Sequence, residues 1–280
     1  MGRVEGKVAF ITGVARGQGR SHAIRLAEEG ADIIGIDAVT PVGSMPYPMG
    51  SPEDLAETAL LIEKTGRQAI LTQVDVRDAD AVRAAVASGV ATLGRLDIVC
   101  ANAGISPPGC PVWEIPPQQW RDVIDINLTG VFNTLAATVP PMRAAANGGA
   151  IIVTSSGAGL RSPQNLGDYN ASKHAVVGLA QTLANEVARE GIRVNVIAPG
   201  TVDTPMVTAN EAQFKVFRPD LENPGLDDCV DIFAMMMPMG KPWIDPVEIS
   251  NAVVFLASDE ARYVTGIVMP VDQGSNNRVF

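Results

Sequence analysis

The sequence predicts an α/β fold, in which one doubly wound parallel sheet of seven strands is flanked by helices. Two observations support this fold class. Short runs of β-branched and aliphatic residues recur along the chain, and amphipathic helical patterns separate them. The runs are almost continuously apolar, as expected for strands that are buried on both faces. Because strand and helix alternate strictly, right-handed crossovers and a doubly wound sheet follow.

The predicted elements alternate in chain order. Strands are expected over residues 8–12, 32–37, 69–76, 96–101, 150–155, 193–198 and 266–271. Helices are expected over residues 17–29, 52–65, 79–92, 117–143, 168–189 and 246–257. The second helix has clear start signals, because Ser51 suits the N-cap, Pro52 suits the first helical position and Asp54 completes a capping box.

Two segments interrupt this alternation. Residues 38–51 form a 14-residue stretch rich in Pro and Gly, and residues 201–245 combine weak periodicity with many Pro and Met residues. Connections in such folds usually run to about 2–6 residues, and longer ones are typically lids or binding loops. Since no linker or repeat is visible, we interpret residues 1–280 as a single domain with an inserted loop, 38–51, and a substrate-lid region, 201–245.

Composition excludes several classes of function. The chain has 280 residues and a net charge of −10, which disfavours nucleic acid and anionic membranes as partners. Residues 1–10 contain no apolar secretion signal, and no apolar run is long enough to span a bilayer. The three cysteines form no paired motif, which is typical of a reducing compartment, so a cytoplasmic location is expected. His22 and His174 match no zinc motif, so no metal site is predicted.

A glycine-rich turn follows the first predicted strand. Gly13, Gly17 and Gly19 surround Arg16 and Gln18 between that strand and a helix. Glycines allow the backbone to approach a pyrophosphate, and the helix N-terminus favours its negative charge. Glycines in a turn can also serve turn geometry alone. The position between strand and helix favours dinucleotide binding.

The ends of later strands point to the same crevice. Asp37 ends the second strand, 20 residues after Gly17, where a carboxylate accepts hydrogen bonds from ribose hydroxyls and repels a 2′-phosphate. This favours NAD over NADP, although Arg16 could pair with a 2′-phosphate and Asp37 could be a solvated strand end. The strand ends also place at this crevice small or polar residues that could be ordinary strand termini: Asp75, Val76, Asn102, Ala103 and Gly104.

Candidate proton-transfer residues follow. Tyr169 and Lys173 stand at i and i+4 of a predicted helix, so they share one face, and the ammonium is expected to lower the pKa of the phenol. Ser156 ends the preceding strand and can donate a hydrogen bond to a carbonyl oxygen. Asn127 lies in a helix interior and could hold a water in a proton relay. Each residue alone could also be a surface pair, a cap or a buried polar contact.

Together these motifs resemble the short-chain dehydrogenase/reductase family over nearly the whole chain, and the family has a Rossmann fold. The resemblance implies that Tyr169 is the acid/base, that Ser156 orients the substrate oxygen and that Asn127 supports a water relay. It also implies that Lys173 binds the nicotinamide ribose, and that the cofactor is NAD. Four further residues would line the nicotinamide: Pro199, Gly200, Val202 and Thr204. A homotetramer formed through the helices 117–143 and 168–189 is implied as well.

A closer resemblance is to the actinobacterial branch that includes carveol dehydrogenases and is often called mycofactocin-associated. It is carried by residues 15–22, 214–225 and 257–263, and by the insertion after Asp37. The resemblance implies that the insertion covers the cofactor and slows NAD exchange, with mycofactocin as the redox partner.

The lid region predicts the kind of substrate. Its flexible apolar side chains suit a hydrophobic secondary alcohol, such as a carveol-like terpenoid or a steroid, but they could equally form core or a subunit interface. These side chains are Met206, Phe214, Phe217, Phe233, Met235, Met236, Met237 and Met239, with Trp113 and Trp243 as further candidate pocket walls. We therefore expect an NAD-dependent alcohol dehydrogenase or ketone reductase. The alternative is a non-catalytic dinucleotide-binding sensor or regulatory subunit. An epimerase or dehydratase of nucleotide sugars is disfavoured by the glycine spacing.

Overall fold

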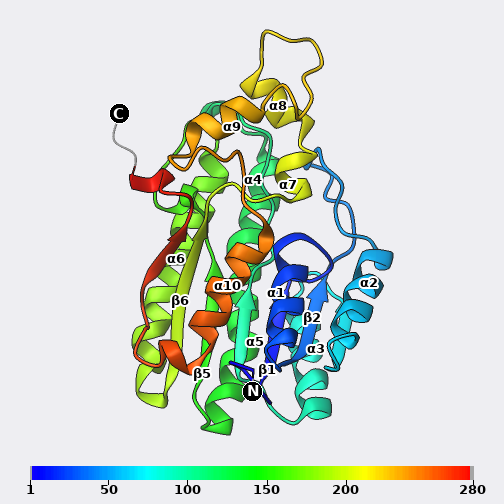
Figure 1. Ribbon diagram of the computed structural model, residues 1–280, viewed down its shortest axis with the longest axis vertical. Coiled ribbons are helices and arrows are strands. Elements are labelled where there is room, and N and C mark those ends of the chain that lie inside the picture. The colour runs from blue at the N-terminus through cyan, green and yellow to red at the C-terminus, as the bar shows by residue number, and fades with distance from the viewer. Residues whose placement is uncertain (1, 278–280) are drawn as a thin grey trace.

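Seven strands form one parallel sheet within residues 2–277, the part of the chain that the computed structural model describes (Figure 1). The strands are β1 (Val8–Thr12), β2 (Asp32–Asp37), β3 (Ala69–Gln73), β4 (Ile98–Ala101), β5 (Gly149–Thr154), β6 (Ile192–Pro199) and β7 (Val268–Val271). Their order in the sheet is β3-β2-β1-β4-β5-β6-β7, and every neighbouring pair is parallel. The predicted doubly wound α/β fold is confirmed.

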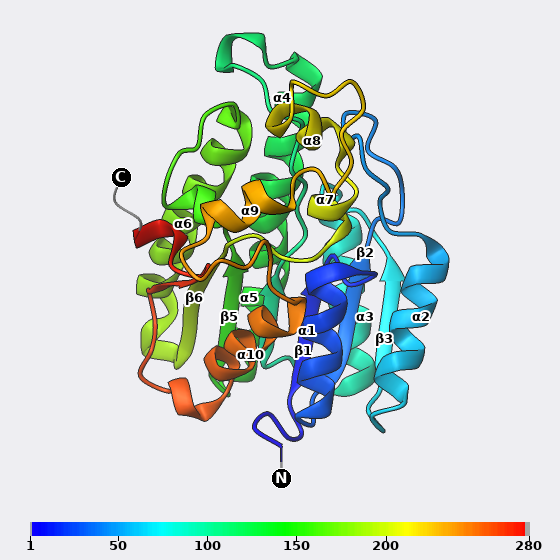
Figure 2. The ribbon, with the colours of Figure 1, turned by 45° about the horizontal axis from the view of Figure 1, so that its top comes forward.

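Helices cover both faces of the sheet, and three short ones stand at its carboxyl edge. The helices are α1 (Gly17–Glu28), α2 (Pro52–Glu63), α3 (Ala79–Leu93), α4 (Pro117–Ile124), α5 (Gly130–Ala145), α6 (Gly167–Val187), α7 (Pro205–Thr208), α8 (Glu211–Phe217), α9 (Val230–Met236) and α10 (Pro246–Ala257). The core on one face includes residues of α1, α2 and α10, and the core on the other face includes residues of α3, α5 and α6. Figure 2 shows α7, α8 and α9 above the sheet. Among residues 2–277, no helix has the length and apolar character needed to cross a bilayer.

Strand β1 illustrates why these runs form central strands. All five of its residues are buried. Val8 and Phe10 belong to the core beneath α3, α5 and α6, whereas Ala9 and Ile11 belong to the core beneath α1 and α10. Because side chains alternate between the two faces of a strand, a continuous apolar run fills both cores.

Several predicted boundaries needed correction. The third strand ends at Gln73 rather than at residue 76, so Asp75 and Val76 lie in the loop after it. The helix predicted over 117–143 is interrupted, because residues Asp125–Thr129 form a π-helical turn between α4 and α5. The helix predicted over 168–189 ends at Val187 and continues only as a 3₁₀ turn. A π turn inserts one extra residue, which the period of the side-chain pattern does not reveal.

The inserted loop, residues 38–51, is an ordered cover on the carboxyl edge of the sheet. Met45 and Tyr47 are 9% and 5% exposed and belong to the core on the α3 and α5 side. The Oγ of Ser44 donates a hydrogen bond to Asp122 over 2.6 Å. At its end, the predicted capping box of Ser51 and Asp54 starts α2.

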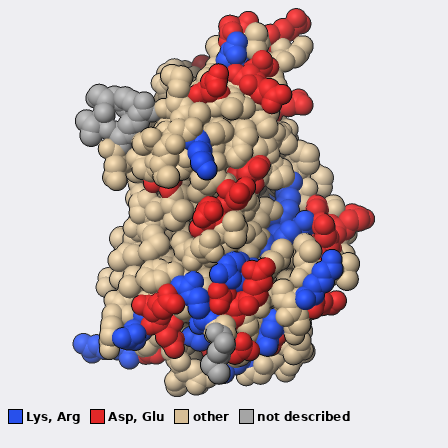
Figure 3. Space-filling model, viewed as in Figure 1, with Lys and Arg blue, Asp and Glu red and all other residues tan. Residues whose placement is uncertain are grey.

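The lid region, residues 201–245, has a small core of its own. Phe214, Cys229 and Phe233 are buried there, and the Trp243 ring lies 6.0 Å from the Phe233 ring. The outer tip of this region carries exposed carboxylates, seen at the top of Figure 3: Asp220, Glu222, Asp227 and Asp228. These charges keep the tip in water while the apolar side chains beneath it face the fold.

Candidate active site

The neighbouring strands β1 and β4 are tied together where their connections leave in opposite directions. The Oγ1 of Thr12 accepts hydrogen bonds from the backbone N–H groups of Asn102 and Ala103, each over 3.0 Å. The Asn102 side chain returns a bond to the Thr12 carbonyl over 3.1 Å. Ligands of open α/β sheets bind at the carboxyl ends of strands at such a switch point. The sequence-predicted residues therefore converge on this crevice.

The glycine-rich turn forms the floor of the crevice. Gly13 has a φ of 73°, and a Cβ at Gly19 would lie 1.9 Å from the Gly13 carbonyl oxygen. Only glycine fits at these two positions, which brings the backbone at the start of α1 close to any ligand in the crevice. The Oε1 atom of Gln18, in the same turn, is buried and has no hydrogen-bond partner within residues 2–277.

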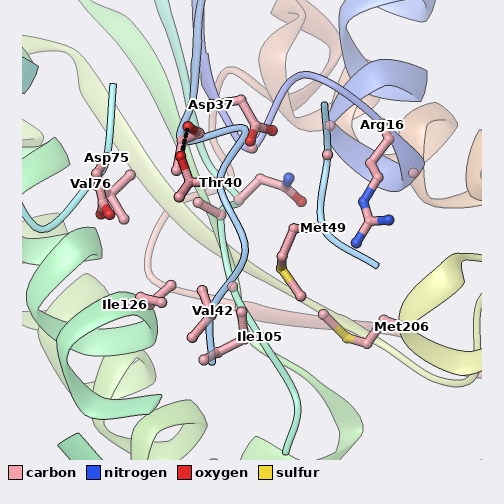
Figure 4. A pocket seen from close by; sticks show the side chains of 18 of the residues that line it. Arg16, Asp37, Thr40, Val42, Met49, Asp75, Val76, Ile105, Ile126 and Met206 are labelled. Carbon is pink, nitrogen blue, oxygen red and sulfur yellow. Dashed lines mark hydrogen bonds between the residues drawn. The ribbon is translucent and has the colours of Figure 1, made fainter. Parts of the chain in front are cut away.

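A first cavity, the cofactor cavity, lies over this turn (Figure 4). The inserted loop supplies part of its wall through Val42, Tyr47 and Met49. Twelve of the predicted cofactor-binding residues line it: Gly13, Arg16, Gly17, Gln18, Gly19, Asp37, Asp75, Val76, Asn102, Ala103, Gly104 and Thr204. The turn, the strand ends and the inserted loop thus line one cavity.

Asp37 is held by backbone donors. Its two carboxylate oxygens accept hydrogen bonds from the N–H groups of Ala15, over 3.0 Å, and Val39, over 3.1 Å. Arg16 lines the same cavity, and no ion pair joins it to an acidic residue within residues 2–277. Burial lowers the pKa of the Arg16 guanidinium. The orientation of the Asp37 carboxylate is therefore set by the backbone and not by the arginine.

Asp75 is the other acidic residue of this cavity. It pairs with Arg77 over 2.6 Å, and although burial opposes ionisation, this arginine lowers the pKa of the carboxyl group. Asp75 is therefore present as a carboxylate that already has a cationic partner.

A second, larger cavity of about 910 Å³, the substrate cavity, adjoins the first. Ser156 follows β5, and Tyr169 and Lys173 project from α6, and all three line its wall. Predicted residues at the end of β6 and after it complete the set: Pro199, Gly200, Val202 and Thr204. Gly104 and Thr204 line both cavities, so the two sites adjoin there, and Lys173 Nζ lies next to Gly104.

Lys173 is a buried cation. It is 3% exposed, its Nζ donates a hydrogen bond to the Thr154 carbonyl over 3.0 Å, and the same atom lies 5.6 Å from the centre of the Tyr169 ring. Burial lowers the pKa of the ammonium to about 8. The lysine is thus close to losing its charge at mildly alkaline pH.

The pKa of Tyr169 departs from the sequence-based expectation. Burial raises the pKa of the phenol, and a hydrogen bond with Ser156 only partly opposes this. The expected lowering by Lys173 is therefore wrong for the polypeptide alone, because the desolvation of the phenolate outweighs an ammonium 5.6 Å from the ring centre.

Asn127 lies behind the cavity wall. It is fully buried in the π turn, and its Oδ1 accepts the N–H of Ile105 over 2.8 Å. Its Nδ2 donates to the Ile105 carbonyl over 2.9 Å and to Ser172 over 3.2 Å. A Cβ added at Gly104 would lie 3.3 Å from both Asn127 Oδ1 and Lys173 Nζ. The position beside Gly104 therefore lies between the asparagine and the lysine, with little room for a side chain.

The chain is similar to known proteins over nearly its whole length. A family model described as enoyl-(acyl carrier protein) reductase matches residues 13–276. The chain is 54% identical over 275 residues to a short-chain type dehydrogenase/reductase of Mycolicibacterium smegmatis, with 98% of each chain covered. It is 49% identical over 275 residues to a (−)-trans-carveol dehydrogenase of Rhodococcus erythropolis, covering 98% of this chain and 99% of the relative. The chain belongs to the short-chain dehydrogenase/reductase family.

A solved structure agrees with this assignment. The crystal structure of carveol dehydrogenase from Mycobacterium avium in complex with NAD matches with a TM-score of 0.97 at 53% identity, covering 99% of this chain and 100% of that one. The family resemblance seen in the motifs is confirmed, and the chain is an enzyme of the dehydrogenase type.

The lid of this short-chain dehydrogenase/reductase divides the predicted apolar residues into two groups. Met206, Phe217, Phe233, Met236 and Met237 line the substrate cavity, and no Asp or Glu lines it. The remaining candidates lie elsewhere. Phe214 and Trp243 pack in the lid core, whereas Met235, Met239 and Trp113 are 72%, 72% and 84% exposed. The cavity is thus apolar on its lid side and free of acidic groups along its described wall.

Sequence reasoning did not assign Tyr47 to the site. Tyr47 lines the cofactor cavity, and its hydroxyl oxygen accepts the backbone N–H of Ser106 over 3.0 Å. Tyr47 has no lysine four residues later, so the motif search for a phenol–ammonium pair passed over it. The available signal was a single aromatic residue in a stretch otherwise rich in Pro and Gly.

Proposed function

We propose that this enzyme oxidises hydrophobic secondary alcohols with NAD and reduces the corresponding ketones in the reverse direction. One observation carries the proposal. Ser156, Tyr169 and Lys173 line a substrate cavity that has an apolar lid and adjoins the cofactor cavity. The relatives named carveol dehydrogenase support a terpenoid alcohol as the substrate class. A non-catalytic sensor would not need this set of residues, so we do not favour it.

The cofactor cavity fits a dinucleotide with an unphosphorylated ribose. Gly13 and Gly19 let the turn pack closely against the start of α1, where backbone N–H groups can face a pyrophosphate, and Asp37 presents its carboxylate at the end of β2. When bound, NAD supplies the nicotinamide carbon that takes the hydride from the alcohol. The NAD-bound relative supports this assignment.

Side chains of the protein carry out the proton transfer. Ser156 orients the alcohol oxygen, and Tyr169 removes the hydroxyl proton as the carbon–hydrogen bond breaks. Lys173 stabilises the phenolate and binds the nicotinamide ribose. Asn127 holds a water in the space beside Gly104, through which the proton leaves toward solvent. A positively charged nicotinamide close to Tyr169 would offset the effect of burial on the pKa of the phenol.

The inserted loop 38–51 accounts for cofactor retention. Its buried side chains cover the cofactor cavity, so we propose that NAD exchanges slowly and that mycofactocin reoxidises it in place. Dialysis of the purified protein, followed by denaturation and an NAD assay, tests this. Protein that emerges empty and turns over freely with added NAD would contradict slow exchange.

The assembly and the location are also proposals. We propose a single-domain protomer in a homotetramer that uses α4, α5 and α6 as interfaces, and Phe132 on α5 is 54% exposed as such an interface requires. Sedimentation equilibrium gives the mass of the assembly. The three free cysteines fit the cytoplasmic location that we propose.

A panel of hydrophobic secondary alcohols tests the activity. Purified enzyme is assayed with free NAD and, separately, with an artificial electron acceptor. Oxidation of cyclic terpenoid alcohols with either acceptor supports the proposal. Failure with every alcohol and both acceptors, in protein shown to contain NAD, would overturn it.

A further inference from the structure

Tyr47 brings the inserted loop into contact with the catalytic side of the molecule. Its ring is 5% exposed and lies in the same core as Ile105 and Ile126. Its hydroxyl oxygen accepts the N–H of Ser106 over 3.0 Å. Figure 4 shows Ile105 and Ile126 next to the loop residue Val42 in this cavity. Tyr47, a residue of the inserted loop, is thus hydrogen-bonded to the backbone that follows β4.

The backbone held by Tyr47 is also held by Asn127. Ile105, which precedes Ser106, exchanges two hydrogen bonds with the Asn127 amide, over 2.8 and 2.9 Å. Gly104, one residue earlier, borders the space between Asn127 Oδ1 and Lys173 Nζ. Residues 104–106 are therefore fixed from two directions, by the inserted loop and by the π turn. Ser106 itself lines the substrate cavity.

The hydroxyl of Tyr47 has a positional role and not an acid–base role. Burial raises the pKa of this phenol far above its ordinary value, and Ser106 donates to it only through a backbone N–H. It therefore stays neutral at any physiological pH. A buried hydroxyl is costly unless it is hydrogen-bonded, and packing alone would be served as well by phenylalanine. The one hydrogen bond it makes within residues 2–277 goes to the backbone beside Asn127.

We propose that Tyr47 is a positioning residue, through which the inserted loop places residues 104–106 against Asn127 and Lys173. The inference rests on the proposed function, because it assigns the loop a second task at the same site. Without the Tyr47 hydroxyl, the backbone N–H of Ser106 loses its acceptor, and the Ile105–Asn127 contact loses its support on one side.

Tyr47→Phe and Ser44→Ala form a matched pair of variants. Tyr47→Phe keeps the packed ring and removes the hydrogen bond to Ser106. Ser44→Ala also removes one hydrogen bond of the loop, the 2.6 Å bond to Asp122, but Ser44 lines neither cavity. At saturating NAD, we expect Tyr47→Phe to lower kcat by about 5- to 10-fold while KM for the alcohol changes by less than about 2-fold. Ser44→Ala should leave kcat unchanged. Equal effects of the two variants, or none in Tyr47→Phe, would overturn the proposal.

Hydrogen exchange tests this placement without relying on turnover. In the NAD-loaded wild type, peptides covering residues 103–109 should be protected, and Tyr47→Phe should speed their exchange by about 5- to 10-fold while Ser44→Ala does not. Unchanged exchange in Tyr47→Phe would refute the positioning role. If the wild type oxidises no alcohol, the proposed function fails on that result, and the exchange rates still decide whether Tyr47 fixes this backbone.

Discussion

The Nζ of Lys173 lies 3.0 Å from the carbonyl oxygen of Thr154 and donates a hydrogen bond to it. The side chain is 3% exposed, and no carboxylate pairs with it within residues 2–277. One neutral acceptor compensates an ammonium poorly for its lost hydration. The buried ammonium therefore lowers the free energy of unfolding, although Lys173 is part of the candidate active site.

Replacing Lys173 with Met should stabilise the protein and abolish its activity. The pKa of the ammonium is about 8 in the fold and 10.5 when unperturbed. This gap corresponds to about 3 kcal/mol against the native state at neutral pH, and losing the Thr154 bond offsets about 1 kcal/mol of the gain. We expect the free energy of unfolding to rise by about 1–2 kcal/mol at pH 7.

Urea denaturation of nucleotide-free protein measures this difference, with the exposed Lys64→Met as control. The sign follows from the direction of the shift. Between pH 8 and 10.5 the unfolded chain binds a proton that the native lysine has released, so wild-type stability from this group rises with pH in that window. A Lys173→Met protein less stable than wild type at pH 7 would refute the argument.

Tyr169→Phe should stop turnover and preserve nucleotide binding. Removing a general base typically costs about 10²–10⁴ in rate, and the ring itself keeps its packing. Steady-state kinetics should show at least about a 100-fold loss in kcat, with little change in the dissociation constant of NAD. Tyr263→Phe, at a side chain that is 90% exposed, is the control and should behave as wild type. Substantial residual activity in Tyr169→Phe would mean that another group moves the proton.

The sequence was sufficient to predict the sheet and to single out most residues of the candidate site. Apolar runs such as β1 indicate a strand that is buried on both faces. The glycines of the turn indicate positions where the backbone is packed too closely for a side chain. These features depend on neighbouring residues in the chain, so they can be predicted from the sequence without knowing the fold. Asp37, Tyr169 and Lys173 were found for the same reason, because their spacing from strand ends and along one helix is encoded locally.

Other features of the site could not be predicted from the sequence pattern. Asn127 was singled out from the sequence, but the π turn that contains it was not, because a helical pattern does not distinguish a π turn from an ordinary helix. Tyr47 looked like a loop residue because its core neighbours, such as Ile105, come from elsewhere in the chain. The direction of the Tyr169 pKa shift depends on how deeply the fold buries the phenol. The lid methionines divided between cavity and solvent because their short helices carry little periodic signal.

Asp37→Asn should weaken the preference for NAD. The amide still accepts a backbone hydrogen bond from Ala15 or Val39, but the repulsion toward a 2′-phosphate is lost and Arg16 remains nearby. We expect the ratio of kcat/KM for NADP to that for NAD to rise by about 10- to 100-fold. Asp75→Asn removes a charge from the same cavity and should leave this ratio unchanged. An unchanged ratio in Asp37→Asn would show that the carboxylate does not select the cofactor.

Gly104→Ala tests the space between Asn127 and Lys173. Gly104 has no positive φ, so alanine is allowed by the backbone, but its Cβ would lie 3.3 Å from both Asn127 Oδ1 and Lys173 Nζ. A water placed there would be displaced, and we expect kcat to fall by about 10-fold. Gly225→Ala is the control, because Gly225 lines neither cavity and an added Cβ would lie no closer than 3.8 Å to a neighbouring atom. Normal turnover in Gly104→Ala would argue against a proton relay through this position.

His22 should make stability depend on pH. It is fully buried between α1 and α10, where its Nδ1 lies 2.8 Å from the Ser250 hydroxyl, and burial lowers its pKa from 6.5 to about 3. Below pH 6.5 the unfolded chain gains a proton that the native ring refuses, so stability falls by about 1.4 kcal/mol per pH unit from this group. His22→Gln should remove that slope, and the exposed His174→Gln should keep it. Urea unfolding at pH 4, 5, 6 and 7 measures the difference between wild type and variant, in which the shared carboxylate titrations cancel. If that difference is the same at all four pH values, His22 does not titrate on unfolding and the assigned burial of a neutral imidazole is wrong.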